Sequence, residues 1–364
     1  MKHFIFCLLL AFLATATFSK ILCASTRIYG FIFDAGIFII SATTAHILIT
    51  IARHFMPKKN IQDLDKKAVF ITGCDSGFGH MCAKRLDALG VTVYAGCLFP
   101  EGAGAAQLKA AASSRLHIVP LDVTRDEDVR KAVEYVKQTI GDKKFWCVLN
   151  NAGILSDLLL EHNSMDAVRK VMEVNALGTV SVTQSFLPLL GDESGRVVCV
   201  VSIFGRVAIP FCVPYCMSKH AALAYVQGLR RELQLTSSGV TVHGIEPSVY
   251  RTPLSDSEIR IAQIKKQLAG SPEDIQKKVN ELYIEKYKLF YRRAVKFTSN
   301  PNENEVVDCM IDAAIGSTPK PCYRPNVRCL VEGWLLKWIP TAVVDWALTT
   351  AARILASDLL DTRS

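Results

Sequence analysis

From Lys67 onward, short apolar runs alternate with longer stretches in which apolar residues recur at helical spacing. This alternation is typical of an α/β fold, in which helices cover both faces of a parallel sheet. Because crossovers between parallel strands are right-handed, we expect a doubly wound sheet that binds ligands beyond the carboxyl ends of its strands. The expected strands are AVFIT, TVYAG, LHIVPLDV, WCVLNNAG, RVVCVVS and VTVHGIEP, and the expected helices lie within 79–89, 126–140, 166–190 and 215–236.

The charge of the chain does not indicate nucleic-acid binding. The net charge is +8, but residues 1–67 hold eight Lys or Arg against three Asp and so carry most of it. The rest of the chain has no basic stripe interleaved with aromatic residues, so no nucleic-acid partner is expected.

The twelve cysteines include no C-x-x-C pair and no zinc-type spacing with His, so no metal site is expected. Unpaired thiols suit a domain that faces the cytosol.

Two apolar runs precede the α/β pattern. They are FIFCLLLAFLATATF at 4–18 and AGIFIISATTAHILITIA at 35–52. Arg53, Lys58 and Lys59 follow the second run, and such a cluster favours the cytosolic side of a membrane. We expect residues 1–56 to be a membrane-anchor region, with both runs forming a hairpin, and residues 57–66 to be a basic linker. The alternatives are a cleaved signal followed by one span, or a mitochondrial presequence, for which the runs are too continuously apolar.

A glycine loop follows the first expected strand. In TGCDSGFG, Gly73, Gly77 and Gly79 lie between that strand and the first expected helix. A helix N-terminus at such a turn can bind a pyrophosphate, because its free N–H groups and its dipole favour an anion. The spacing is weak evidence when it stands alone, because any tight turn can need glycine.

Further along the chain lie residues that could carry out chemistry. Tyr215 and Lys219 in PYCMSK are four residues apart and would project from one face of a helix. Ser202 ends an expected strand thirteen residues before Tyr215, and Asn175 lies twenty-seven residues before Ser202. NNAG, at 150–153, ends another expected strand.

Together these motifs resemble the short-chain dehydrogenase/reductase superfamily over roughly residues 66–350. TGCDSGFG, LDVT at Asp122, NNAG, Asn175, Ser202 and the Tyr215/Lys219 pair match the family in order and spacing. ITGCDSGFG, YAGCL, SFLPLL and EPSVYRTP are similar to the branch that holds retinol dehydrogenases, oxidative 17β- and 11β-hydroxysteroid dehydrogenases and D-β-hydroxybutyrate dehydrogenase. The resemblance implies a Rossmann-type sheet and hydride transfer between an alcohol carbon and a nicotinamide cofactor.

The family pattern assigns a role to each of four catalytic candidates. Tyr215 would be the general base in oxidation and the general acid in reduction. A phenol with a pKa of about 10 is a poor base at neutral pH, so the Lys219 ammonium and a positive nicotinamide ring are expected to lower it. Ser202 would hydrogen-bond the substrate oxygen, and Lys219 would also bind the ribose hydroxyls. Asn175 would hold a water that links Lys219 to solvent.

NAD is expected as the cofactor in preference to NADP. The glycine loop offers Asp75, which would repel a 2′-phosphate, and no cation follows the second strand, where Cys97 stands in place of the usual acidic residue. Asp122 would position adenine and Thr252 would contact the carboxamide, while Ser248 replaces the usual Gly after Pro247. The expected cofactor contacts are Gly73, Asp75, Ser76, Gly77, Phe78, Gly79, Cys97, Asp122, Val123, Asn151, Ala152, Gly153, Tyr215, Lys219, Pro247 and Thr252.

The catalytic domain is expected over 67–300, with a lid insertion at 253–300 and a C-terminal segment at 301–364. The charged stretch 253–300 is either a pair of solvated helices or a lid of helices over the site. Residues 330–348 hold three of the four tryptophans and predict an amphipathic cover over an apolar pocket that could also rest on a bilayer.

The expected substrate is a lipophilic alcohol or ketone such as a steroid or retinoid, because Phe204, Ile209 and Phe211 would line an apolar pocket. A hydroxy acid of the 3-hydroxybutyrate type, paired with Arg206, is the alternative. A non-catalytic, membrane-tethered nucleotide-binding scaffold is the alternative outside the enzymes.

The resemblance also implies a homo-oligomer built through the helices at 166–190 and 215–236. We expect the endoplasmic reticulum membrane as the location, with a mitochondrial membrane as the alternative.

Overall fold

The computed structural model describes residues 59–329 apart from 157, 192, 193 and 237, then 331 and 339–360, and short helical pieces at 33–38, 41–42 and 44–45. The chain divides into two compact units, 1–58 and 59–364. Most of the predicted membrane anchor lies outside the described residues. Within the described part of the chain, no helix combines the length and the apolar character needed to cross a bilayer.

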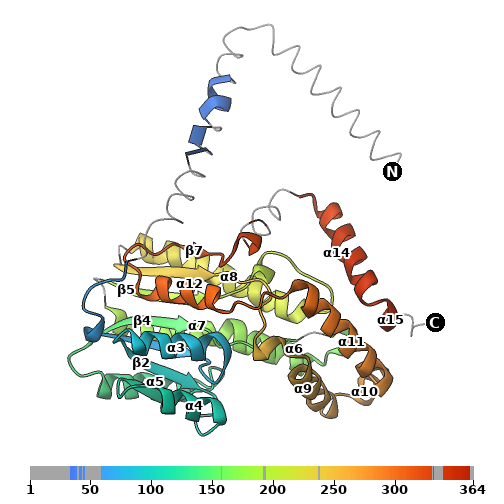
Figure 1. Ribbon diagram of the computed structural model, residues 1–364, viewed down its shortest axis with the longest axis horizontal. Coiled ribbons are helices and arrows are strands. Elements are labelled where there is room, and N and C mark those ends of the chain that lie inside the picture. The colour runs from blue at the N-terminus through green and yellow to red at the C-terminus, as the bar shows by residue number, and fades with distance from the viewer. Residues whose placement is uncertain are drawn as a thin grey trace. The chain divides into compact units, whose positions relative to one another are not determined.

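The described residues of the second unit form a seven-stranded parallel sheet in the order β3-β2-β1-β4-β5-β6-β7 (Figure 1). The order reverses between β1 and β4, and a crevice at such a switch point is where α/β sheets bind ligands. The strands are β1 Lys67–Thr72, β2 Thr92–Cys97, β3 Leu116–Pro120, β4 Lys144–Asn150, β5 Gly195–Val200, β6 Val240–Ile245 and β7 Cys322–Tyr323. The predicted parallel α/β sheet is confirmed, although the short β7 was not predicted.

Alternate residues of the strands face opposite layers of helices, as the period of a pleated strand requires. Val69 and Ile71 of β1 pack into one core, and Ala68 and Phe70 pack into the other. The first core is covered by α3 Gly77–Ala88, α4 Ala103–Ala111 and α12 Asn304–Ile315. The second is covered by α5 Asp126–Thr139, α7 Gly178–Leu190 and α8 Val213–Leu235. Of these helices, α4 was not predicted.

Shorter helical segments lie between these elements. They are the helix α6 Met165–Met172, a π-helical turn η3 Glu173–Leu177, and the 3₁₀ turns η1 Leu64–Lys66, η2 Leu160–His162, η4 Ile203–Gly205 and η5 Pro253–Ser255. From Asn60 on, the predicted linker 57–66 packs against the end of α12. Asn60 bridges to Gly316, and Ile61 donates to the Ile315 carbonyl.

A third apolar core holds the stretch predicted as a lid. We call α9 Ser257–Ala269, α10 Glu273–Lys278 and α11 Glu281–Thr298 the lid helices. They share this core with Leu158, Phe211 and residues of α14 Thr341–Leu355 and α15 Ser357–Leu360. Figure 1 shows the lid helices grouped together at one end of the sheet layers. They are therefore not a fully solvated pair. The sheet layers also extend past residue 300, the predicted end of the catalytic domain, because α12 and β7 belong to them.

Candidate active site

The glycine loop lies where β1 gives way to α3, because its glycines permit a tight turn and close packing. Gly73 and Gly77 have φ angles of 70° and 59°, which side chains rarely adopt. A Cβ on Gly79 would collide with the Gly73 carbonyl oxygen and the Asn151 amide. Ser76 is the N-cap of α3 and makes no capping bond with its side chain. The helix N-terminus therefore offers backbone N–H groups at the switch point, as an anion cradle requires.

Residues of the NNAG motif hold this loop in place. The Asn151 amide donates to the carbonyls of Thr72 and Gly73, each at 3.0 Å. The Thr72 hydroxyl accepts from the backbone N–H groups of Asn151 and Ala152, each at 2.9 Å. A Cβ on Gly153 would lie 3.7 Å from Lys219 Nζ, so the motif runs from the glycine loop to the catalytic candidates.

Asp75 joins the glycine loop to the end of β2. Its carboxylate accepts from the backbone N–H groups of Leu98 at 3.0 Å and Phe99 at 2.8 Å. Cys97, the predicted ribose contact, is fully buried in the first core, so its thiol is not presented to a ligand. Burial raises the pKa of this thiol to about 12. The negative group at this strand end is therefore Asp75.

The other predicted adenosine contacts have clear structural roles. The Asp122 carboxylate accepts from the Thr124 N–H at 2.9 Å and the Thr124 hydroxyl at 2.7 Å. Burial acts to raise the pKa of Asp122, but these hydrogen bonds outweigh it and the pKa is lowered. Val123 packs in the second core, and Phe78 lies edge-on to Tyr250 and against the first core. Asp122 is thus a charged carboxylate beyond β3.

Asn175 occupies the π-helical turn between α6 and α7, a kind of irregularity that is common at functional sites. Its side chain is buried, accepts from the Ile154 N–H and donates to the Ile154 carbonyl, both at 2.8 Å. It also donates to the Ser218 hydroxyl at 3.0 Å, which itself donates to the Tyr215 carbonyl at 2.7 Å. Asn175 thus ties the loop after β4 to the helix that carries Tyr215.

Ser202 lies two residues beyond β5 and caps the turn η4. Its hydroxyl donates to the Pro247 carbonyl at 3.2 Å and accepts from the Phe204 N–H at 3.2 Å. It also lies near the Tyr215 phenol, whose pKa it acts to lower. The structure therefore brings together the strand-end Ser and the helical Tyr.

Tyr215 and Lys219 lie one turn apart near the start of α8, with Lys219 Nζ 5.7 Å from the centre of the phenol ring. Both side chains are buried. Lys219 Nζ donates to the Val200 carbonyl at 3.2 Å, and burial lowers the pKa of the ammonium to about 8. Burial raises the pKa of the Tyr215 phenol, although the nearby Ser202 side chain acts in the opposite direction. The predicted lowering of this pKa is not produced by the protein groups alone.

Thr252, the predicted carboxamide contact, lies in the loop after β6. It begins η5 and shares a capping box with Ser255. A Cβ on Gly77 would lie 3.9 Å from the Thr252 side chain, so this loop faces the start of α3. The glycine loop and Thr252 are therefore neighbours at the start of α3.

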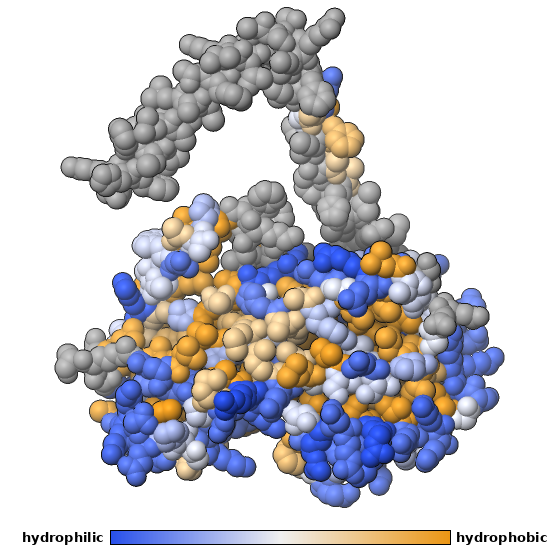
Figure 2. Space-filling model, turned by 180° about the vertical axis from the view of Figure 1, so that it is seen from behind, coloured by the Kyte–Doolittle hydropathy of each residue, from blue (hydrophilic) through white to orange (hydrophobic). Residues whose placement is uncertain are grey.

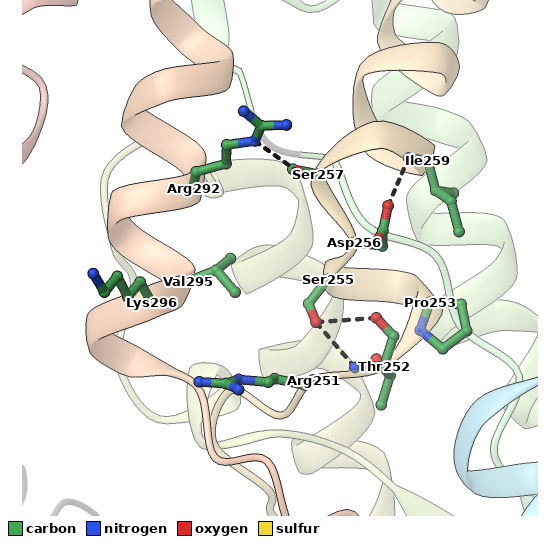
Figure 3. Close-up of a pocket in the computed structure, with 10 residues that line it drawn as sticks. All are labelled: Arg251, Thr252, Pro253, Ser255, Asp256, Ser257, Ile259, Arg292, Val295 and Lys296. Atoms are coloured by element: carbon green, nitrogen blue, oxygen red, sulfur yellow. Dashed lines mark hydrogen bonds between the residues drawn. The ribbon is translucent and has the colours of Figure 1, made fainter.

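A pocket of about 580 Å³ lies beside Thr252, between η5, the start of α9, and α11 (Figure 3). Arg251, Arg292 and Lys296 give it a basic lining, with the Asp256 carboxylate on the opposite side. Its lining does not include Ser202, Tyr215 or Lys219, so the pocket borders the crevice but does not hold the catalytic candidates.

The predicted substrate-pocket residues lie in the segment between Ser202 and Tyr215. Phe204 is half-buried, and its ring lies 6.4 Å from that of Tyr215 in an edge-on arrangement. Phe211 packs against Phe290 of α11, with ring centroids 4.6 Å apart, and Ile209 is half-buried. Phe204 therefore borders the phenol, whereas Phe211 attaches this segment to the lid helices.

Arg206 is already paired within the protein. Its guanidinium donates two bonds to the Glu246 carboxylate, at 2.7 and 2.6 Å. This arrangement disfavours the alternative in which Arg206 binds a substrate carboxylate. Glu246 and Ser218 were not predicted from the sequence. The signal for Glu246 was present, because an acidic residue directly after a buried strand needs a partner.

A doubly wound parallel sheet with a glycine loop at its switch point and a Ser–Tyr–Lys group beyond its strand ends defines a dehydrogenase-type α/β protein. Residues 67–261 match the profile described as short chain dehydrogenase, and the chain belongs to this family of oxidoreductases. The resemblance predicted from the motifs is thus confirmed.

The curated relatives are steroid and retinol dehydrogenases. The chain is 36% identical to 17-beta-hydroxysteroid dehydrogenase type 6 of Bos taurus, over 83% of this chain and 94% of that protein. It is 35% identical to retinol dehydrogenase 5 of Mus musculus, over 77% of this chain and 87% of that protein. A solved short-chain dehydrogenase from Burkholderia phymatum in complex with NAD matches with a TM-score of 0.62 and 23% identity, over 76% of this chain and 94% of that one. This last likeness is one of fold.

Proposed function

We propose that this protein is an NAD-dependent dehydrogenase that oxidises the hydroxyl group of a lipophilic alcohol, such as a steroid or a retinoid, or reduces the corresponding ketone or aldehyde. The observation that carries the proposal is the buried Tyr215 phenol, which has the Ser202 side chain near enough to act on its pKa and Lys219 one helical turn away. This group stands beside a glycine cradle whose shape suits the pyrophosphate of a dinucleotide.

When bound, the nicotinamide would supply the hydride acceptor and a positive charge beside the phenol. Ser202 would hydrogen-bond the substrate oxygen and hold the hydroxyl against Tyr215. The Tyr215 phenolate would take the hydroxyl proton as the hydride leaves the carbinol carbon, which yields a carbonyl product and a neutral phenol. Because the protein groups alone keep the phenol neutral, a positive charge is needed to generate the base. A water relay through Asn175 stays a prediction.

Asp75 supports the preference for NAD. Its carboxylate is held at the end of β2 by two backbone N–H groups, where the adenosine ribose of a dinucleotide would lie. A fixed negative charge there would repel the 2′-phosphate of NADP.

Three observations support an apolar substrate. The named relatives are hydroxysteroid and retinol dehydrogenases. Phe204 borders the Tyr215 ring, and the Arg206 cation is neutralised by Glu246. The hydroxy-acid alternative therefore lacks its cation.

The deciding experiment measures NADH formation by the detergent-solubilised protein with a steroid alcohol, retinol and 3-hydroxybutyrate in parallel. We expect turnover with an apolar alcohol, with a higher kcat/KM for NAD than for NADP. Tyr215→Phe is expected to lose nearly all turnover and to bind NADH as tightly as the wild type does. Equal turnover in this variant would refute the mechanism, and turnover with 3-hydroxybutyrate alone would refute the substrate class.

We further propose that the protein is attached to the endoplasmic reticulum membrane by its N-terminal region. Besides the two apolar runs, α14 carries exposed Val343, Trp346 and Ile354, and such a face suits a bilayer surface. Alkaline carbonate extraction of cells that express the full chain should leave it in the membrane pellet, in a fraction with markers of the endoplasmic reticulum. Release into the supernatant would contradict the attachment.

A homo-oligomer built through α6, α7 and α8 also remains a proposal. Figure 2 shows apolar side chains in a band between hydrophilic margins on one face of the protein. The exposed apolar residues of α6, η3 and α8 are Met165, Leu177, Val213, Met217 and Leu235. Light scattering on the solubilised protein should give at least twice the mass of one chain, and a monomer would contradict this arrangement.

A further inference from the structure

Glu246 is a buried carboxylate directly after β6, with only 1% of its surface exposed. One of its oxygens accepts from Arg206 Nη2 at 2.6 Å and from the Cys322 thiol at 3.1 Å. The other accepts from Arg206 Nε at 2.7 Å and from Arg324 Nε at 3.1 Å. The carboxylate therefore holds two cations, and Arg206 is the one bound through two nitrogens, Nε and Nη2.

Arg206 lies at the end of the turn that begins at Ser202. Its backbone N–H closes η4 by donating to the Ile203 carbonyl at 2.9 Å. At the start of the turn, the Ser202 hydroxyl and the Ile203 N–H both donate to the Pro247 carbonyl, at 3.2 and 2.9 Å. Glu246 and Pro247 are adjacent in the chain, so neighbouring residues of one strand end bind both ends of the turn.

The turn is also pressed against the helix that carries the phenol. A Cβ on Gly205 would lie 2.6 Å from the Lys219 carbonyl oxygen of α8. The turn therefore has little room to move toward α8, and the bonds from Arg206 to Glu246 prevent it from moving away. Together with the bonds to the Pro247 carbonyl, these two restraints fix the position of the Ser202 hydroxyl relative to α8.

We propose that Arg206 and Glu246 are positioning residues, whose bidentate ion pair holds the η4 turn so that Ser202 meets both the substrate oxygen and the Tyr215 phenol. This inference rests on the proposed function, because it assigns a role within the same reaction. Neither residue touches the reacting atoms. Their contribution is geometric, and misplacement by about 1 Å can cost a reaction on the order of 100-fold.

Arg206→Gln tests the proposal, and Arg324→Gln is its matched control. Each variant removes one cation from the same carboxylate, and each leaves Glu246 with the other arginine and the Cys322 thiol. Only Arg206 belongs to the Ser202 turn. We expect Arg206→Gln to lower kcat for the alcohol by about 10- to 100-fold with NADH affinity unchanged, and Arg324→Gln to retain a kcat near that of the wild type. An equal loss in both variants would overturn the proposal, because it would mean that only the charge of the cluster matters.

A double-mutant cycle with Ser202→Ala separates positioning from general damage to the fold. Once the Ser202 hydroxyl is gone, Arg206→Gln should lower kcat by little more, because its effect acts through that hydroxyl. The same fold loss in both backgrounds would overturn the proposal. If Arg206→Gln folds poorly, Arg206→Lys serves in its place, because it keeps the charge and loses the bidentate geometry. Full turnover by Tyr215→Phe would instead refute the proposed function. If Tyr215→Phe is inactive but the kcat losses of Arg206→Gln and Ser202→Ala are additive, only the positioning role is overturned.

Discussion

Lys219 is buried, and the free energy that its burial costs the folded protein depends on pH. Burial lowers the pKa of its ammonium to about 8, whereas an unfolded lysine titrates near 10.4. Between these values unfolding takes up a proton, so the free energy of unfolding increases with pH there. Below about pH 8 the ammonium is charged in both states, and its burial costs on the order of 3 kcal/mol.

Lys219→Met should therefore make the cofactor-free protein more stable than the wild type at pH 7, by up to about 3 kcal/mol. The difference should shrink as the pH rises toward 10. Urea unfolding of both proteins at pH 7 and pH 9.5 measures it. A variant that is less stable than the wild type at pH 7, or a difference that does not change with pH, would contradict the buried-cation account. The same variant should be inactive, since the predicted partner of Tyr215 is lost.

Among the elements, the β1–α3 junction depends most on glycine. Gly79→Ala should distort the cradle, because the new methyl group meets the Gly73 carbonyl and the Asn151 amide. We expect a loss of about 1–3 kcal/mol in stability and a weaker NADH complex, measured by thermal unfolding and fluorescence titration.

Gly228→Ala on α8 is the control for this change. No atom lies within 4 Å of a Cβ built at Gly228, and replacing a glycine inside a helix by alanine gains about 0.5–1 kcal/mol. If both variants bind NADH with equal affinity, close packing at Gly79 does not shape the cradle.

Most elements of the sheet could be predicted because their apolar residues show a clear period. The six predicted strands match β1–β6, since each contains a short run of mostly apolar residues next to a helical pattern. The helix α4 escaped prediction because AGAAQLKAA is rich in small residues and buries only Ala105 and Leu108. The strand β7 has two residues, which is too short to show any period.

The part of the candidate site whose residues are close in sequence could also be predicted. Tyr215 and Lys219 are close in sequence, and one helical turn brings them together. Arg206 and Glu246 are 40 residues apart, and Arg324 lies 78 residues beyond Glu246. Pairs of this kind depend on strand order, which local patterns do not determine. The burial of the Cys97 thiol likewise follows from packing between layers.

At the scale of the whole molecule, Phe211 links the lid helices to the active-site segment. Phe290→Ala should remove its ring contact and loosen the third core. We expect a higher KM for a large apolar alcohol, faster proteolysis within 253–300, and unchanged NADH affinity. Kinetic assays and limited proteolysis followed by mass spectrometry measure these effects.

The neighbouring Leu289 supplies the control on the same helix. Leu289 is 43% exposed, whereas Phe290 is 8% exposed, so Leu289→Ala should behave like the wild type in both assays. Equal KM values in the two variants would show that the lid helices do not affect substrate binding.

The last strand of the sheet is also the last to be synthesised. The outer edge of β6 is covered when Gly244 and Glu246 donate to the carbonyls of Pro321 and Tyr323, at 3.1 and 2.8 Å. Until those residues emerge from the ribosome, this edge presents open hydrogen-bonding groups that can pair with another chain. A polypeptide that stops before residue 320 would thus contain Asn175, Ser202, Tyr215 and Lys219. Its β6 edge would stay unpaired, and we expect it to aggregate.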